Sequence, residues 1–99
     1  MSANILILIG TGDGLQLAKE LGLRAEFNVH IFVDKRSRLR SNLNVAGEIS
    51  SLRNEEFFLR FLIENGIEAL IDASHPFDNG TTELCKRVSK LADIKLTHF

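Results

Sequence analysis

The segment Ile5-Leu6-Ile7-Leu8-Ile9-Gly10-Thr11-Gly12-Asp13-Gly14 joins an unbroken apolar run to three alternate glycines. Five consecutive apolar residues are typical of a strand that is buried on both faces of a parallel sheet. The next stretch, 15–25, has helical periodicity, and its apolar face holds Leu15, Ala18, Leu21 and Ala25. A buried strand, a glycine turn and an amphipathic helix in this order predict the start of an α/β fold.

Strand and helix patterns continue to alternate along the chain. Further strands are expected at 29–33, 43–49, 69–71 and 94–97, although Gly47 weakens the second of these. A helix is expected at 53–65, with a core face of Phe57, Phe58, Phe61 and Leu62. Another is expected from about residue 81, with Leu84, Val88 and Leu91 on one face.

These elements predict a Rossmann-like α/β fold, a doubly wound parallel sheet of four to five strands between helices on both faces (three layers, αβα). The expected strand order is 3-2-1-4-5, which makes the first and fourth strands neighbours. The loops that follow these two strands, 10–14 and 73–79, then diverge around a common crevice. Open α/β sheets bind ligands in such a crevice, so we expect a ligand site there.

The composition of the chain excludes several classes of protein. The chain has 99 residues, 44% of them apolar and 25% charged, as expected for one globular domain with a single core. The net charge of −1 argues against nucleic-acid binding, and no apolar run is long enough for a membrane span. The start of the chain has no basic region typical of a secretory signal, and the single Cys85 forms no intramolecular disulfide, so we expect a cytoplasmic protein.

The cysteine and histidine positions do not indicate a metal site. His30 and His98 have no further ligands at the usual spacing. Cys85 comes one residue after the apolar stripe of the last helix, and we interpret it as a packed thiol. We therefore expect no bound metal.

The glycine turn has the features of a phosphate-binding loop. Gly10 and Gly12 have the G-x-G spacing of a dinucleotide loop, and Gly14 follows, but the third glycine of the fingerprint would fall at Leu15. Thr11 and Asp13 complete the turn, and Asp13 either caps the helix or binds a ligand hydroxyl or water. The alternative is a tight turn that holds no ligand.

A basic stretch follows the second predicted strand, where dinucleotide folds meet the adenosine ribose. Asp34 alone would favour the 2′-hydroxyl of NAD. The next residues carry cations and a hydroxyl suited to the 2′-phosphate of NADP: Lys35, Arg36, Ser37 and Arg38. The positive charges of this stretch outnumber the negative charge of Asp34, which favours NADP. The alternative is an ordinary solvated loop.

The segment Asp72-Ala73-Ser74-His75-Pro76-Phe77 follows the fourth predicted strand. His75 is a candidate proton donor, because imidazole titrates near neutrality, or a hydrogen-bond partner of a cofactor phosphate or carboxamide. Ser74 adds a hydroxyl, and Pro76 stiffens the loop. The alternative is that His75 fills a turn while Asp72 caps the loop backbone.

Two of these segments, 5–13 and 70–77, together resemble the amino-terminal half of the precorrin-6A reductase family. Members open with a strand and Gly-Gly-Thr-x-Glu, and later carry Asp-Ala-Thr-His-Pro-Phe/Tyr. The resemblance extends over essentially the whole chain, and its most specific part is the His-Pro segment. It implies NADPH-dependent reduction of one double bond in a corrin-precursor tetrapyrrole during cobalamin synthesis, by an enzyme with two Rossmann-like domains that bind cofactor and macrocycle between them.

By this resemblance, residues 1–99 are the NADP-binding, amino-terminal half of the two-domain plan. Gly10, Thr11 and Gly12 match the glycine-loop positions of the family, and Asp13 matches its acidic position. Ser74, His75 and Pro76 match the Thr-His-Pro segment, and Ser74 and His75 are the implied catalytic residues.

Two substitutions and one absence depart from the family pattern. Ile9 replaces the first family glycine, and Ser74 replaces threonine but keeps the hydroxyl. We expect these 99 residues to hold only one domain of the two-domain plan, so a second domain, another chain or a homodimer is expected to complete the site. The alternatives are a non-catalytic nucleotide-binding module and an inactive truncated remnant.

Overall fold

The structure is a computed structural model that describes residues 3–10, 12–34, 45–74 and 78–98. Its five strands form one parallel sheet in the order β3-β2-β1-β4-β5, which confirms the predicted α/β fold and strand order. The strands are β1 (Ala3–Ile9), β2 (Phe27–Val33), β3 (Val45–Glu48), β4 (Ile67–Ala73) and β5 (Lys95–His98). The helices are α1 (Gly12–Gly22), α2 (Glu55–Glu64) and α3 (Asn79–Ala92), and a 3₁₀ helix, η1 (Ile49–Arg53), precedes α2.

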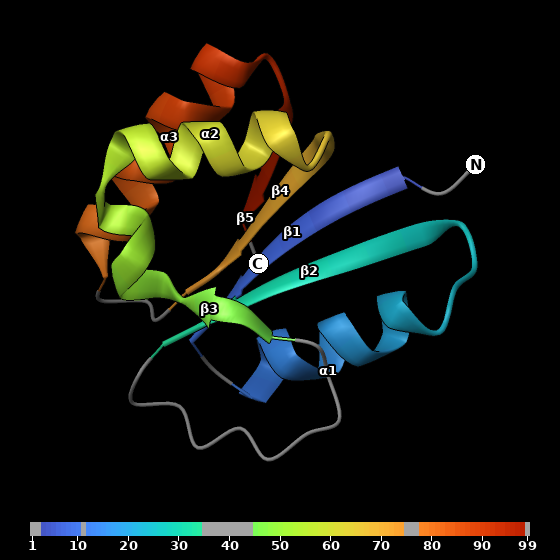
Figure 1. Ribbon diagram of the computed structural model, residues 1–99. Coiled ribbons are helices and arrows are strands. Elements are labelled where there is room, and N and C mark those ends of the chain that lie inside the picture. The colour runs from blue at the N-terminus through green and yellow to red at the C-terminus, as the bar shows by residue number, and fades with distance from the viewer. Residues whose placement is uncertain (1–2, 11, 35–44, 75–77, 99) are drawn as a thin grey trace.

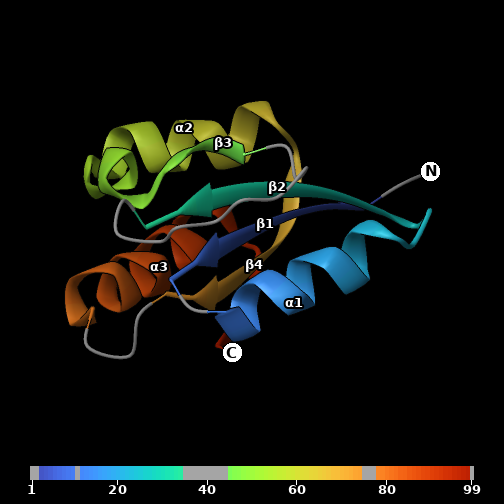
Figure 2. The ribbon, with the colours of Figure 1, turned by 90° about the horizontal axis from the view of Figure 1, so that it is seen from below.

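The helices lie on both faces of this sheet. α2 and α3 lie on one face, and α1 is the helix of the described residues that lies on the other (Figures 1 and 2). Right-handed crossovers account for this division: the connection from β1 to β2 runs in one direction across the sheet, and those through α2 and α3 run in the other.

β1 occupies the middle of the sheet and contributes to both hydrophobic cores. Leu6 and Leu8 pack with residues of α2 and α3, whereas Ile5, Ile7 and Ile9 pack on the α1 side with Ala18. Successive side chains of a strand point to opposite faces, so a strand between two helical layers must be apolar throughout. This is why the unbroken run of β1 predicted its position correctly.

The boundaries of α1 differ from the prediction. The helix begins at Gly12 instead of residue 15, and it ends at Gly22 instead of residue 25. The turn after β1 is therefore shorter than the predicted 10–14 loop. Asp13 is the second residue of α1.

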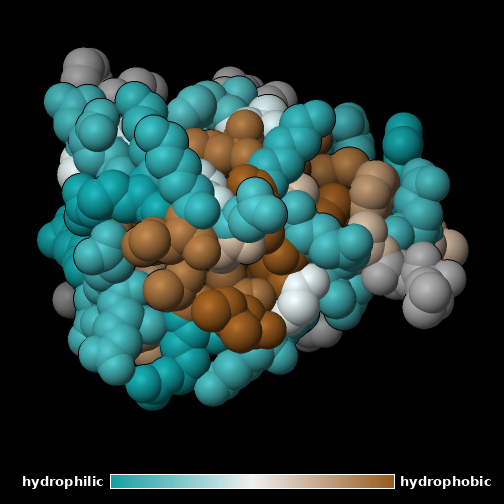
Figure 3. All heavy atoms as spheres, turned by 90° about the horizontal axis from the view of Figure 1, so that it is seen from above, coloured by the Kyte–Doolittle hydropathy of each residue, from teal (hydrophilic) through white to brown (hydrophobic). Residues whose placement is uncertain are grey.

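The predicted core faces of α2 and α3 need two corrections. Phe58 is fully buried, but Phe57 is 43% exposed, and on α3 Leu91 is 64% exposed while Cys85 is buried beside Val88. Adjacent residues of a helix are turned by about 100° from each other, and the rotation of α2 places Phe58 in the core and Phe57 at the surface. Hydrophobic surface therefore remains on the outer face of this layer (Figure 3).

Side chains cap the amino termini of α2 and α3. Asn54 Oδ1 accepts a hydrogen bond from the Phe57 amide at 3.1 Å, and Asp78 Oδ1 accepts one from the Thr81 amide at 3.1 Å. α3 ends at Ala92 and is capped by Asp93, whose φ of 55° is left-handed. These residues satisfy backbone groups that the helices themselves leave unpaired.

Candidate functional site

The carboxyl ends of β1 and β4 lie side by side, as the predicted crevice requires. The Gly10 amide donates a hydrogen bond of 2.8 Å to the carbonyl of Ala73, directly after the paired residues Ile9 and Ala73. On the other side, the Asp34 amide donates to the carbonyl of Ile9 at 3.0 Å. The arrowheads of β1, β2 and β4 point to the same edge of the sheet (Figure 2). The glycine turn thus leaves the sheet between the ends of β2 and β4.

Gly14 allows the first turn of α1 to approach the end of β4. A Cβ atom built at Gly14 would lie 2.8 Å from the Cβ of Ala73, closer than carbon atoms pack. In the dinucleotide fingerprint, the third glycine provides this close packing of helix and strand. Gly14 performs that role here one residue earlier than the expected position, which is occupied by Leu15.

Asp72, the residue before Ala73, faces the opposite side of the sheet and interacts with three segments. Its Oδ1 accepts hydrogen bonds from the Ser74 amide at 3.1 Å and from the Ser74 hydroxyl at 2.5 Å. Its Oδ2 accepts a hydrogen bond from the Thr82 hydroxyl of α3 at 3.0 Å, and Nδ1 of His98 lies 3.3 Å from the same oxygen. The bond to the Ser74 amide confirms the interpretation that Asp72 caps the loop backbone.

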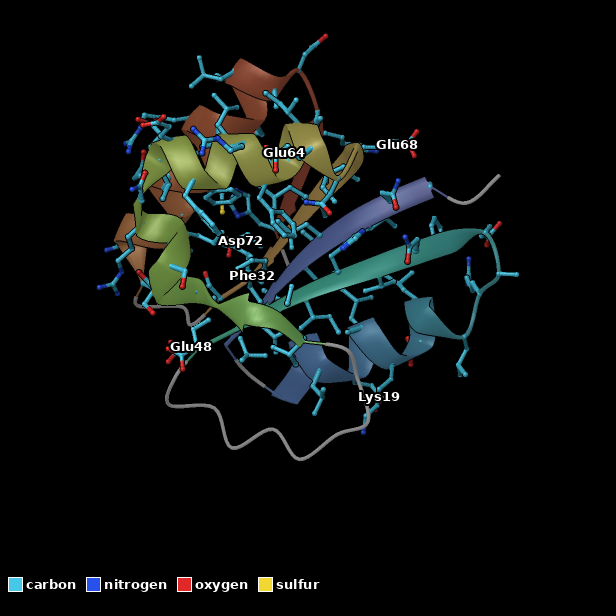
Figure 4. All side chains as sticks on the ribbon, viewed as in Figure 1. Lys19, Phe32, Glu48, Glu64, Glu68 and Asp72 are labelled. Atoms are coloured by element: carbon cyan, nitrogen blue, oxygen red, sulfur yellow. The ribbon has the colours of Figure 1, made fainter. Side chains whose placement is uncertain are left out.

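Figure 4 places Asp72 between the sheet and the helical layer of α2, at the far end of β4 from Glu68. Only 4% of the residue is exposed. A buried carboxylate is stable when hydrogen-bond donors replace its water, and Asp72 has donors at both oxygens. It therefore joins the strand, the following loop and α3 at the carboxyl edge of the sheet.

The family model of precorrin-6x reductase CbiJ/CobK matches residues 4–99. The chain belongs to this family. Among solved structures, a chain described as CobK precorrin-6A reductase is similar, with a TM-score of 0.84 and 20% sequence identity over 98% of the present chain. The match covers 37% of that CobK chain, so the present chain spans little more than a third of its length. None of the curated proteins matches the sequence.

In this member of the CbiJ/CobK family, two carboxylates lie near the end of β4 and the start of α3. These carboxylates, Asp72 and Asp78, act with burial to raise the pKa of the Cys85 thiol well above its usual range; burial is the larger cause. On the other face of the sheet, the amino terminus of α1 follows Gly10 and carries the positive end of a helix dipole. The backbone amides at this end of α1 favour an anionic group.

Several predicted site residues of this family member lie outside the described residues. These are Thr11, Lys35, Arg36, Ser37, Arg38, His75 and Pro76. Gly10, Gly14 and Ser74 lie at the adjacent carboxyl ends of β1 and β4, and the backbone of Gly12 and Asp13 forms the start of α1. The contact of His98 with Asp72 was not predicted, because the pairing of these two residues depends on the register of β4 and β5.

The described residues contain neither a cluster of metal ligands nor a helix that could span a membrane. Within residues 3–10, 12–34, 45–74 and 78–98, no three His, Cys, Asp or Glu side chains are grouped so that they could hold a metal ion. In the same ranges, no helix has the length and apolar character needed to cross a membrane.

Proposed function

We propose that this chain is the NADP-binding domain of a precorrin-6A-reductase-type oxidoreductase in cobalamin biosynthesis. Family membership supports the reaction class. The observation that carries the proposal is the hydrogen bond between Gly10 and Ala73, because it joins the glycine turn to the Ser74 turn at the carboxyl edge of the sheet. That edge is where α/β sheets of this order bind dinucleotides.

The described residues fit a dinucleotide. Gly10 and Gly12 put no side chain in the way of a pyrophosphate, and the start of α1 offers backbone amides and positive potential. The nicotinamide ring would then lie near the Ser74 turn, next to the end of β4. When bound, NADPH supplies the hydride, and the protein orients it.

The remaining roles rest on residues outside the described ranges. Arg36 and Arg38, with Lys35 and Ser37, would bind the 2′-phosphate. His75 would donate the proton that accompanies hydride transfer or bind the cofactor, while Pro76 stiffens its loop. These roles follow from the sequence pattern and from the family.

The corrin-precursor substrate requires more protein than this chain. Hydride transfer needs excluded water and two reactants held at close distance, and a macrocycle needs walls on two sides. We propose that these 99 residues are the amino-terminal half of a two-domain plan and that a further domain or subunit completes the substrate site. By itself, the chain is expected to bind NADP weakly and to reduce no substrate.

Titration with NADP⁺ and NAD⁺, followed by amide chemical shifts and by thermal stability, tests the cofactor assignment. We expect shifts at residues 12–14, 34–38 and 74, tighter binding of NADP⁺, and a rise in melting temperature because the ligand binds only the folded chain. Replacing both Arg36 and Arg38 with alanine should remove the preference for NADP⁺ and leave NAD⁺ binding almost unchanged. Arg24→Ala, at an exposed cation that pairs with Glu26, is the control.

Two outcomes of this titration would contradict the proposal. Unchanged shifts and melting temperature with both dinucleotides would indicate a remnant that has lost its ligand. Stronger binding of an unrelated nucleotide would indicate a non-catalytic nucleotide-binding module.

A further inference from the structure

The hydroxyl of Ser74 is held by a buried carboxylate. Its Oγ lies 2.5 Å from Oδ1 of Asp72, and the Ser74 amide donates to the same oxygen. An ionised carboxylate only accepts hydrogen bonds, so the hydroxyl must donate its one hydrogen to Asp72. The oxygen of Ser74 is left with lone pairs and no hydrogen for any other partner.

The carboxylate of Asp72 is restrained at its second oxygen as well. The Thr82 hydroxyl donates to Oδ2 at 3.0 Å, and the imidazole of His98 lies 3.3 Å from it on β5. Rotation of the carboxylate would break contacts with two other elements. Asp72 therefore keeps one orientation, and the direction of the Ser74 hydroxyl hydrogen is kept with it.

Ser74 lies where the direction of its hydroxyl hydrogen would affect the binding of a ligand. It directly follows Ala73, whose carbonyl accepts the hydrogen bond of Gly10, and its side chain is only half-buried. An oxygen that can only accept distinguishes groups with N–H or O–H bonds from groups that present only lone pairs. A mismatch is costly because it leaves two facing acceptors unpaired.

We propose that Ser74 determines specificity by accepting a hydrogen bond from the carboxamide N–H of the nicotinamide ring, and that Asp72 is the positioning residue that imposes this polarity. This inference rests on the proposed function and goes beyond it by assigning the atom that recognises the carboxamide. Ser74 then supplies no proton to the reaction.

The test compares NADP⁺ with its 3-acetylpyridine analogue, in which a methyl ketone replaces the carboxamide. The analogue has the same charge and phosphates and nearly the same shape, but it lacks the N–H group. We expect the unmodified chain to bind NADP⁺ roughly five- to tenfold more tightly than the analogue, which corresponds to one net hydrogen bond. Ser74→Ala should reduce this ratio to about 1, mainly by weakening the binding of NADP⁺.

Three further variants separate the recognition role from a structural one. Ser74→Thr keeps the hydroxyl and should keep the ratio. Asp72→Asn provides an amide N–H that can donate to the Ser74 oxygen, which releases the hydroxyl hydrogen and should lower the ratio. Ser89→Ala is the matched control, because Ser89 also uses its hydroxyl as a donor, to the Lys86 carbonyl, but near the other end of α3.

Each remaining outcome has a definite meaning. Equal binding of the two dinucleotides by the unmodified chain would overturn this inference and leave the proposed function intact. A ratio that persists in Ser74→Ala would show that another group recognises the carboxamide, and would also overturn it. No measurable binding of either dinucleotide would overturn the proposed function, and the inference with it.

Discussion

Gly14 lies so close to Ala73 that a Cβ atom on the glycine would be 2.8 Å from the Cβ of the alanine. The first turn of α1 therefore packs directly on the last residue of β4. This contact and the hydrogen bond from Gly10 to Ala73 hold the two turns of the candidate site at a constant separation.

The variant Gly14→Ala tests this packing. We expect a loss of ~1–3 kcal/mol of stability from overpacking, partly offset by a helix-propensity gain of up to about 1 kcal/mol. NADP⁺ binding should also weaken, because the turn must move away from β4. Chemical denaturation measures the first effect and titration the second.

Two further variants show whether the contact itself is responsible. Adding Ala73→Gly to Gly14→Ala removes the colliding Cβ and should recover part of the stability, which a double-mutant cycle detects. Gly22→Ala at the end of α1 is the control, since nothing lies within 4 Å of its added Cβ. A Gly14→Ala protein as stable as the unmodified chain would refute the close approach.

The buried Asp72 should be more important for stability than its single charge suggests. Asp72→Asn replaces one acceptor oxygen with an N–H₂ group that faces donors, so we expect a loss of ~2–4 kcal/mol. Asp93→Asn makes the same chemical change at an exposed, left-handed position at the end of α3, and should be neutral or slightly stabilising. Urea denaturation measures the loss of unfolding free energy in both variants. Equal losses would show that the hydrogen bonds of Asp72 contribute no special stability.

Cys85 should be unreactive in the folded chain and should make stability depend on alkaline pH. Its side chain is buried, and burial with the nearby carboxylates of Asp72 and Asp78 raises its pKa from an ordinary value of 9.0. The folded state therefore keeps the proton when the unfolded state loses it. The ionisation of Cys85 therefore leaves the free energy of unfolding unchanged below about pH 9 and lowers it as the pH rises above 9.

Two measurements test the behaviour of this thiol. A disulfide reagent at pH 8 should label Cys85 only after unfolding. The variant Cys85→Ala should lose less stability between pH 9 and pH 10.5 than the unmodified chain does. Rapid labelling of the native protein would contradict the burial of Cys85.

The neighbouring residues Phe57 and Phe58 should differ greatly in their effect on folding. Phe58 is fully buried, so Phe58→Ala should cost ~3–5 kcal/mol, whereas Phe57→Ala should cost less than about 1 kcal/mol because that ring is 43% exposed. The two substitutions are chemically identical and lie on the same helix. Thermal or urea unfolding of each variant measures the difference.

The fold could be predicted because its decisive signals are local. The apolar run of β1 and the turn after it are contiguous in the sequence, and crossover handedness then limits the strand order. The start of α1 was predicted less well because three alternate glycines indicate a loop, whereas the close packing of Gly14 on Ala73 is satisfied inside a helix.

The candidate site could be predicted only in part, because some of its contacts depend on register. Asp72 and Ser74 are near each other in sequence, and the capping bond between them was foreseen. The contact of Asp72 with His98 depends on the alignment of β4 with β5, which no short motif encodes. Which of Phe57 and Phe58 faces the core likewise depends on how α2 is rotated on the sheet.

The central place of β1 has a consequence for the motions of the protein. Its backbone pairs with β2 on one side and β4 on the other, and the side chains of residues 5–9 are buried. Its amide hydrogens should consequently exchange with deuterated water more slowly than those of β3 or β5, and only through opening of the whole domain. The glycine turn would then extend from the segment of the chain that opens least often.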